Sequence, residues 1–191
     1  MIGLLGGSFD PVHHGHLVAA RVLMERLELT ELRLMPAAEQ PFKVGRHGAS
    51  AEDRAAMVGL AVAGESGLRL ERVEVERPGP SYTVDTLRLL REREPGQRFI
   101  VLIGADAALD LPKWREADAL AELAEIVAFG RGGAQAEAHR LVRRRVDVPA
   151  VEISATEIRQ RVAEGRSIRY WVPDAVAEYI ARRGLYRKTE E

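Results

Sequence analysis

GGSFDPVHHGH, residues 6–16 of the chain, lies between two different hydrophobic patterns. An apolar run at residues 2–5 leads into it, and apolar residues at three- and four-residue steps follow it from Leu17 to Leu27. This change of period predicts a strand, a tight turn and a helix, which together form the first unit of an α/β domain. Because ligands of such domains bind at the carboxyl ends of the strands, the turn is the first candidate for a binding site.

The residue types in this turn suit a phosphate group. Gly6 and Gly7 let the backbone approach a bulky anion, and the amides at the start of the following helix favour negative charge. Three of the chain's five histidines fall within residues 13–16. His13 and His16, with Asp10, are also an alternative zinc site, but the glycines upstream fit phosphate better.

Further along the chain, apolar runs alternate with helical patterns. We predict strands at residues 31–37, 68–75, 99–103, 126–129 and 148–153. Helices are predicted to begin at Ser50, Thr83, Ser154 and Pro173, and a solvated helix is predicted over residues 134–145. This order indicates a single-domain α/β protein, with a Rossmann-like, doubly wound parallel sheet and helices on both faces. We expect the domain to span residues 1–187 and a polar tail to follow at residues 188–191.

The composition of the 191-residue chain excludes several classes of protein. The formal net charge is −1, which gives no bulk electrostatic reason to expect nucleic acid or a membrane as a partner. Cysteine is absent, so disulfides and thiolate metal sites are excluded. No apolar run has the length of a membrane span, and the apolar start is too short for a signal peptide. We expect a cytoplasmic protein and leave a homo-oligomer open.

Two motifs resemble the signature of one nucleotidyltransferase superfamily. GGSFDPVHHGH resembles its GG(T/S)FDPxHxGH motif, and ISATEIR at residues 153–159 is similar to its ISxTxIR motif. The stretches at residues 77–87, 103–106 and 112–114, and the ending at residues 179–187, are similar to bacterial nicotinate-nucleotide adenylyltransferases of this HxGH superfamily. The resemblance covers nearly the whole chain.

The resemblance implies a reaction and a set of site residues. A phosphate oxygen of nicotinate mononucleotide would attack the α-phosphorus of ATP in line, without a covalent enzyme intermediate. The products would be nicotinate adenine dinucleotide and pyrophosphate, a step of NAD biosynthesis, with Mg²⁺ held mainly by the phosphates. The residues implied in catalysis are His13, His16, Lys43 and Arg159. Those implied in ATP binding are Gly6, Gly7, Ser8, Phe9, His13, His16, Gly104, Asp106, Ile153, Ser154, Thr156 and Arg159.

The acceptor side is implied by the same resemblance. Its residues would be Lys43, Tyr82, Thr83, Val84, Asp106, Trp114 and Arg131. The pyridine ring would stack on Trp114, and backbone amides near residues 82–84 and beyond Trp114 would hold its carboxylate. Donors in that position would discriminate against the NH₂ of nicotinamide. From the residues alone, a core role for Trp114 and a packing role for Tyr82 stay open.

The chain departs from the family pattern in the loop after the second strand. The family often has Pro-Pro-His-Lys, whereas residues 40–43 here are Gln-Pro-Phe-Lys. Lys43 is kept, but Phe42 cannot donate a hydrogen bond. The missing histidine is either dispensable or replaced by His47. A second departure is Gly132 after Arg131, where the family has proline.

Three alternatives remain at the level of sequence. The same chemistry on nicotinamide mononucleotide or phosphopantetheine is one. A dinucleotide-binding oxidoreductase is another: Glu39 follows the second strand where a ribose-binding acid would lie, but the G-x-G-x-x-G fingerprint is absent. The third is a non-catalytic nucleotide sensor on the same fold.

Overall fold

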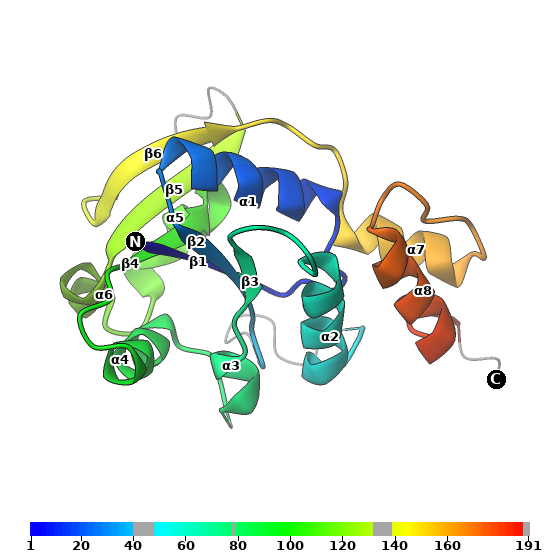
Figure 1. Cartoon of the computed structure of the whole chain (residues 1–191), viewed down its shortest axis with the longest axis horizontal. Helices are drawn as coiled ribbons and strands as arrows, with labels where there is room; N and C mark the ends of the chain where they lie inside the picture. Colours follow the sequence, from blue (N-terminus) through cyan, green and yellow to red (C-terminus); the bar gives the residue numbers. More distant parts are fainter. Residues whose placement is uncertain (40–47, 78, 132–138, 189–191) are drawn as a thin grey trace.

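The computed structural model describes residues 1–39, 48–77, 79–131 and 139–188. Within these residues, six parallel strands form one sheet in the order β3-β2-β1-β4-β5-β6 (Figure 1). The strands are β1 (Ile2–Gly7), β2 (Glu31–Pro36), β3 (Leu68–Leu70), β4 (Phe99–Gly104), β5 (Glu125–Arg131) and β6 (Val142–Val148). β1 pairs with β2 on one side and with β4 on the other, so the strand order reverses next to β1.

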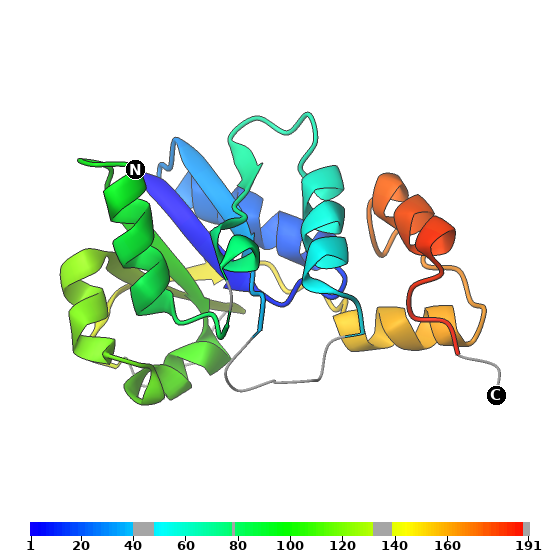
Figure 2. The same cartoon turned by 90° about the horizontal axis from the view of Figure 1, so that it is seen from below.

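Helices cover both faces of the sheet. Their bounds are α1 (His14–Arg26), α2 (Ala51–Ala61), α3 (Val73–Glu76), α4 (Thr83–Arg93), α5 (Ala105–Asp110), α6 (Ala117–Leu123), α7 (Ala155–Ala163) and α8 (Asp174–Arg183). Buried residues of α1, α2, α7 and α8 form a core with one face, and those of α3, α4, α5 and α6 form a core with the other. Figures 1 and 2 show α1 and α4 on opposite faces, and α7 and α8 beside α2 at one end of the molecule.

The central strands explain why both faces are covered. In β4, Ile100 and Leu102 pack towards α1, while Phe99, Val101 and Ile103 pack towards α4. All five are at most 6% exposed, as expected for a parallel strand buried on both faces. The predicted α/β class and doubly wound parallel sheet are confirmed. None of the helices in the described part is both long and apolar enough to cross a membrane.

The third strand is shorter than predicted. β3 ends at Leu70, and α3 occupies residues that we predicted to continue the strand to Val75. The backbone N–H of Glu71 still donates to Leu34 of β2, but that of Val73 donates locally to Oε1 of Glu71 at 3.1 Å instead of to a neighbouring strand. The helical turn that follows buries both Val73 and Glu74, which a strand would direct to opposite faces.

The chain after β5 also differs from the prediction. The helix predicted over residues 134–145 is wrong for residues 142–145, which lie in β6, and residues 132–138 lie outside the described part. The strand predicted over residues 148–153 is wrong beyond Val148, where β6 ends. Arg143, Arg144 and Arg145 are exposed on this edge strand, and Arg144 pairs with Glu125 at 2.6 Å. A charged run indicates a solvated surface, and an edge strand provides one as well as a helix does.

Candidate active site

The carboxyl ends of β1, β2 and β4 meet where the strand order reverses. Gly7 lies level with Pro36 of β2, and the N–H of Ala37 donates to the carbonyl of Gly7 at 3.0 Å. On the other side, β4 ends at Gly104, which is also the N-cap residue of α5. In a doubly wound sheet this is the crevice in which ligands bind.

The turn between β1 and α1, residues 8–13, is called the first turn below, and it is built around Phe9. Its φ is +48°, an uncommon value for a residue with a side chain, and it is 2% exposed. A Cβ atom added to Gly7 would lie 3.0 Å from the Phe9 ring, so glycine at position 7 leaves room for that ring. A Cβ atom on Gly6 would meet only the Met35 side chain, at 3.8 Å. Of the two glycines, Gly7 is therefore the one at which a side chain would crowd Phe9.

His13 and His16 stack on each other at the start of α1. Their ring centroids are 3.7 Å apart and the rings are inclined by 26°. The backbone N–H of His13 donates to Nδ1 of His16 at 3.3 Å, which leaves Nε2 of His16 to carry the proton and act as a donor. Nδ1 of His13 is buried and has no hydrogen-bond partner in the part of the chain that the structure describes.

Burial sets the protonation state of these two rings. It lowers the pKa of His13 to about 4, with a further contribution from His14. It lowers the pKa of His16 to about 3, with a contribution from His13. Both imidazoles are thus neutral at neutral pH in the free protein.

A buried arginine, which our sequence analysis missed, holds the loops around this turn. Arg54 of α2 is 1% exposed and donates to the carbonyls of Ser8 at 2.7 Å and Ala38 at 3.0 Å. It thereby joins the chain after β1 to the chain after β2. Position 54 lies on the same helical stripe as the buried Met57 and Val58. A charged residue on an otherwise apolar stripe is the sequence pattern that could have identified this buried arginine.

The C-terminal motif lies beside the first turn. Nη1 of Arg159 in α7 donates to the carbonyl of Asp10 at 2.7 Å, although 149 positions separate the two residues. Nη2 of Arg159 donates to Oγ1 of Thr156 at 3.2 Å. Ser154 is the N-cap of α7, and its hydroxyl accepts from the N–H of Glu157 at 3.2 Å. Ile153, directly before the cap, is partly buried against the core.

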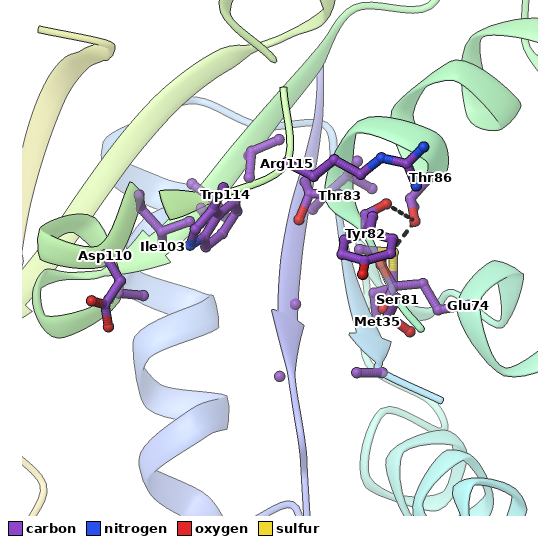
Figure 3. Close-up of a pocket in the computed structure, with 18 of the residues that line it drawn as sticks. Met35, Glu74, Ser81, Tyr82, Thr83, Thr86, Ile103, Asp110, Trp114 and Arg115 are labelled. Atoms are coloured by element: carbon purple, nitrogen blue, oxygen red, sulfur yellow. Dashed lines mark hydrogen bonds between the residues drawn. The ribbon is translucent and has the colours of Figure 1, made fainter. Parts of the chain in front are cut away.

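A cavity of about 790 Å³ opens beside β1 (Figure 3). Gly6 and Gly7 line its floor, and Figure 3 shows Trp114 and Tyr82 on opposite sides of β1. Both rings are partly exposed, and the guanidinium of Arg115 lies 5.0 Å from the centre of the Tyr82 ring. These two aromatic side chains thus line a cavity instead of being fully enclosed in the core.

The N-terminus of α4 and the end of β4 complete this cavity. Thr83 lines it, whereas the Val84 side chain is 1% exposed and packs in the core, leaving only its backbone for a ligand. Tyr82 is the N-cap residue and makes no side-chain hydrogen bond to the first turn of α4. Gly104 and the exposed Asp106 line the opposite edge.

A buried carboxyl group, also missed by our sequence analysis, lines the same cavity. Glu74 is 5% exposed, and its Oε1 accepts from the hydroxyl of Thr86 at 2.9 Å. Burial raises the pKa of Glu74, opposed by hydrogen bonds from Thr86 and Ser81 and by the charge of Arg77. The prediction of a strand over residues 68–75 gave no reason to expect a buried carboxyl group at position 74, which lies in α3.

Some predicted site residues lie outside what the structure describes. They are Lys43, with its neighbours Phe42 and His47, and the side chain of Arg131; the backbone of Arg131 ends β5. In the described residues, no group of three or more His, Asp or Glu side chains is arranged to hold a metal ion. The carboxylate of Asp10, considered for zinc, instead accepts hydrogen bonds from two backbone amides and a tyrosine.

The fold and the site define the class of nucleotide-binding α/β proteins, with a glycine turn, helix N-termini and a crevice at the reversal of strand order. A family model described as cytidylyltransferase-like matches residues 4–161. A probable nicotinate-nucleotide adenylyltransferase of Thermus thermophilus is 49% identical over 186 residues, which cover 97% of this chain and 99% of that protein. One from Thermomicrobium roseum is 44% identical over 198 residues, covering 99% and 92%.

Solved structures agree on the fold. Plasmodium falciparum nicotinic acid mononucleotide adenylyltransferase complexed with NaAD superposes with a TM-score of 0.77 at 19% identity, covering 97% of this chain and 96% of that one. The chain belongs to the cytidylyltransferase-like family and, within it, to the nicotinate-nucleotide adenylyltransferases. The family predicted from the motifs is confirmed, and the oxidoreductase hypothesis is excluded.

Proposed function

We propose that this chain transfers the AMP group of ATP to nicotinate mononucleotide, giving nicotinate adenine dinucleotide and pyrophosphate. One observation carries the proposal: the stacked histidines and Arg159 lie at one edge of the sheet, next to a cavity bordered by Trp114 and Tyr82. The histidines and Arg159 suit a polyphosphate, and the rings of Trp114 and Tyr82 suit a pyridine ring. The names of the close relatives support the same reaction.

The polyphosphate side acts by positioning and by hydrogen bonding. An acceptor phosphate oxygen attacks the α-phosphorus, and the bond from that phosphorus to the bridging oxygen of pyrophosphate breaks. No protein nucleophile is needed. His16 donates from Nε2 to an oxygen of the α-phosphate, on which charge grows in the transition state. Arg159 and the N-terminal amides of α7 hold the departing phosphates.

The acceptor side provides selectivity. The pyridine ring stacks on Trp114, and the first-turn amides of α4 donate to its carboxylate. Nicotinamide would present an NH₂ group to some of these donors, and a donor facing a donor loses a hydrogen bond. Asp106, at the edge of the cavity, accepts hydrogen bonds from sugar hydroxyls.

Mg²⁺ fits this site as an ion that arrives with ATP. Protein sites for Mg²⁺ often provide only one or two carboxylates, with substrate phosphates and water as the other ligands. Asp106 and Asp110 are the exposed carboxylates that line the cavity in the described residues, and the phosphates of ATP are the main ligands that we assign to the ion. When bound, Mg²⁺ neutralises charge on the phosphates and favours the departure of pyrophosphate. The cytoplasmic location and the oligomeric state remain predictions.

The reaction is tested by measuring pyrophosphate release with Mg²⁺-ATP and three acceptors: nicotinate mononucleotide, nicotinamide mononucleotide and phosphopantetheine. We expect the nicotinate nucleotide to exceed the others in kcat/KM by roughly a hundredfold or more. A higher rate with either other acceptor would contradict the acceptor assignment. Tight ATP binding without turnover on any of them would favour a nucleotide sensor instead.

A further inference from the structure

A buried carboxylate joins three distant segments at the polyphosphate side of the site. Asp10 is 4% exposed. Its Oδ2 accepts from the N–H of Gly48 at 2.7 Å, and its Oδ1 accepts from the N–H of Ala49 at 3.1 Å. The hydroxyl of Tyr186, 176 positions further along the chain, donates to the same Oδ1 at 2.7 Å. A side chain from the last part of the chain therefore helps to fix the first turn.

The same aspartate orients Arg159. The guanidinium donates to the Asp10 carbonyl, and its Nη1 lies 3.9 Å from Oδ2 of that residue. The Arg159 side chain remains 29% exposed, so it can still reach a ligand. Its direction is set by Asp10 and by the hydrogen bond to Thr156.

Packing links Tyr186 directly to Arg159. A Cβ atom on Gly48 would lie 2.9 Å from the Tyr186 ring and 3.1 Å from Cδ of Arg159. The two side chains thus pack against the same glycine. Tyr186 also has a φ of +64°, a left-handed conformation that is costly for a residue with a side chain. Burial and the charge of Asp10 raise the pKa of Tyr186, so its hydroxyl keeps the proton that it donates.

We propose that Tyr186 is a positioning residue for ATP: its hydroxyl on Asp10 and its ring on Gly48 hold Arg159 and the first turn in the geometry that binds the polyphosphate. It does not itself touch the substrate in this proposal. The inference rests on the proposed function, because it assigns the polyphosphate to the side where Arg159 lies. It predicts a defect confined to ATP, since Asp10, Arg159 and Tyr186 are not among the residues that line the pyridine cavity.

The test compares Tyr186→Phe with Tyr179→Phe. Tyr179 is a matched control, because its hydroxyl also donates to a buried carboxylate, that of Asp53, at 2.9 Å between α8 and α2. Both variants lose one hydrogen bond to a charged group, so we expect similar falls in thermal stability. In Tyr186→Phe we expect the KM for ATP to rise roughly tenfold, the scale of such a hydrogen bond, with the KM for the nicotinate nucleotide unchanged. In Tyr179→Phe we expect both constants to stay at wild-type values.

A second variant and a double variant separate positioning from general loosening. Gly48→Ala pushes a methyl group between the Tyr186 ring and Arg159, and we expect the same ATP-selective defect. In an Arg159→Ala background, adding Tyr186→Phe should change the KM for ATP by less than about twofold, because residues that act through one another are not additive. A further tenfold rise in that background would overturn the role assigned to Arg159.

The outcomes distinguish this inference from the proposed reaction. If Tyr186→Phe behaves as Tyr179→Phe does, or weakens both substrates equally, the positioning role is wrong while the reaction stands. If the wild-type protein forms no dinucleotide, the reaction is wrong. Calorimetric titration with ATP alone then still measures whether Tyr186→Phe weakens polyphosphate binding and Tyr179→Phe does not. Equal ATP affinities in that titration would overturn the inference.

Discussion

Neutral imidazoles are well suited to a polyphosphate whose charge changes during reaction. Burial holds the pKa values of His13 and His16 far below their usual value, so neither ring adds positive charge to the ground state. The hydrogen bond received by Nδ1 of His16 fixes its proton on Nε2, the atom left to face a ligand. A preoriented donor is most effective where charge develops in the transition state.

Removing this donor should therefore affect turnover more than folding. We expect His16→Ala to lower kcat by roughly 10²–10³-fold, the usual effect of losing one such donor. His14→Ala is the matched control, because His14 is the neighbouring histidine that we do not place in the site; it should keep nearly normal turnover. Steady-state kinetics with circular dichroism spectra of both variants would check this. A near-normal rate for His16→Ala would remove it from the mechanism.

The buried Glu74 should make stability depend on pH. Its pKa is raised in the folded protein above its ordinary value of 4.5. In the pH interval between that ordinary value and the raised pKa, the folded state therefore binds more protons than the unfolded state. The free energy of unfolding should fall through this interval and stay lower above it. Glu74→Gln keeps a side-chain oxygen that can accept from Thr86, but its amide group cannot ionise. The free energy of unfolding of the variant should therefore rise relative to that of the wild type as pH increases. Urea denaturation from pH 4.5 to 8 would measure it, and a constant difference would contradict the assignment.

At the scale of elements, helix N-termini define both halves of the site. α7 contacts the turn between β1 and α1 through Arg159 and Asp10, and α4 presents its first turn to the cavity. Ser154 caps α7, and Ser50 caps α2 through the equivalent bond, at 3.0 Å from the N–H of Asp53; the Ser50 hydroxyl also donates to Oδ2 of Asp53 at 2.7 Å. Only the Ser154 cap belongs to the helix that carries Arg159, so a comparison of the two caps can separate helix capping from ligand binding.

Ser154→Ala and Ser50→Ala should separate capping from ligand binding. Each should lower the free energy of unfolding by about 0.5–2 kcal/mol through loss of an N-cap. Only Ser154→Ala should also raise the KM for ATP, because its hydroxyl and the amides that it orients lie at the polyphosphate side. Denaturation curves and kinetics of both variants test this. Equal KM values would assign Ser154 to capping alone.

At the scale of the whole molecule, the two ends of the chain meet at the first turn. Hydrogen bonds join Asp10 to Arg159 and Tyr186, and Arg54 joins the loops after β1 and β2. A ligand in contact with the turn should therefore stabilise segments that are distant in sequence. On addition of ATP, we expect slower amide hydrogen exchange at residues 8–16, 48–54 and 155–163 together, and little change in β6. Protection limited to residues 8–16 would show that the segments are not coupled.

The sequence was sufficient for the central strands of the sheet and for the first turn. The continuous apolar run at Phe99–Gly104 predicts a buried parallel strand. The change of period around Gly7 predicts a strand followed by a turn and a helix. Edge strands were not predictable in the same way. In β6 most side chains are exposed and charged, and its pairing with β5 is invisible to local pattern.

The parts of the site that were missed are those formed by burial. Arg54 and Glu74 are charged residues, and their placement in the interior depends on partners from other segments, 46 positions away for the Arg54 contact with Ser8. The convergence of Asp10, Arg159 and Tyr186 also depends on tertiary contacts, and the motif resemblance placed Arg159 in the ATP site without placing Asp10 or Tyr186 beside it. The roles of Lys43 and Arg131 stay predictions.

The most direct test of the account is a crystal structure of the protein with nicotinate mononucleotide and a non-hydrolysable ATP analogue. We predict that the triphosphate lies between the His13–His16 pair and Arg159, and that the pyridine ring lies on Trp114 with its carboxylate at the first turn of α4. A triphosphate bound away from the histidines, or a pyridine ring outside the cavity between Trp114 and Tyr82, would contradict the account.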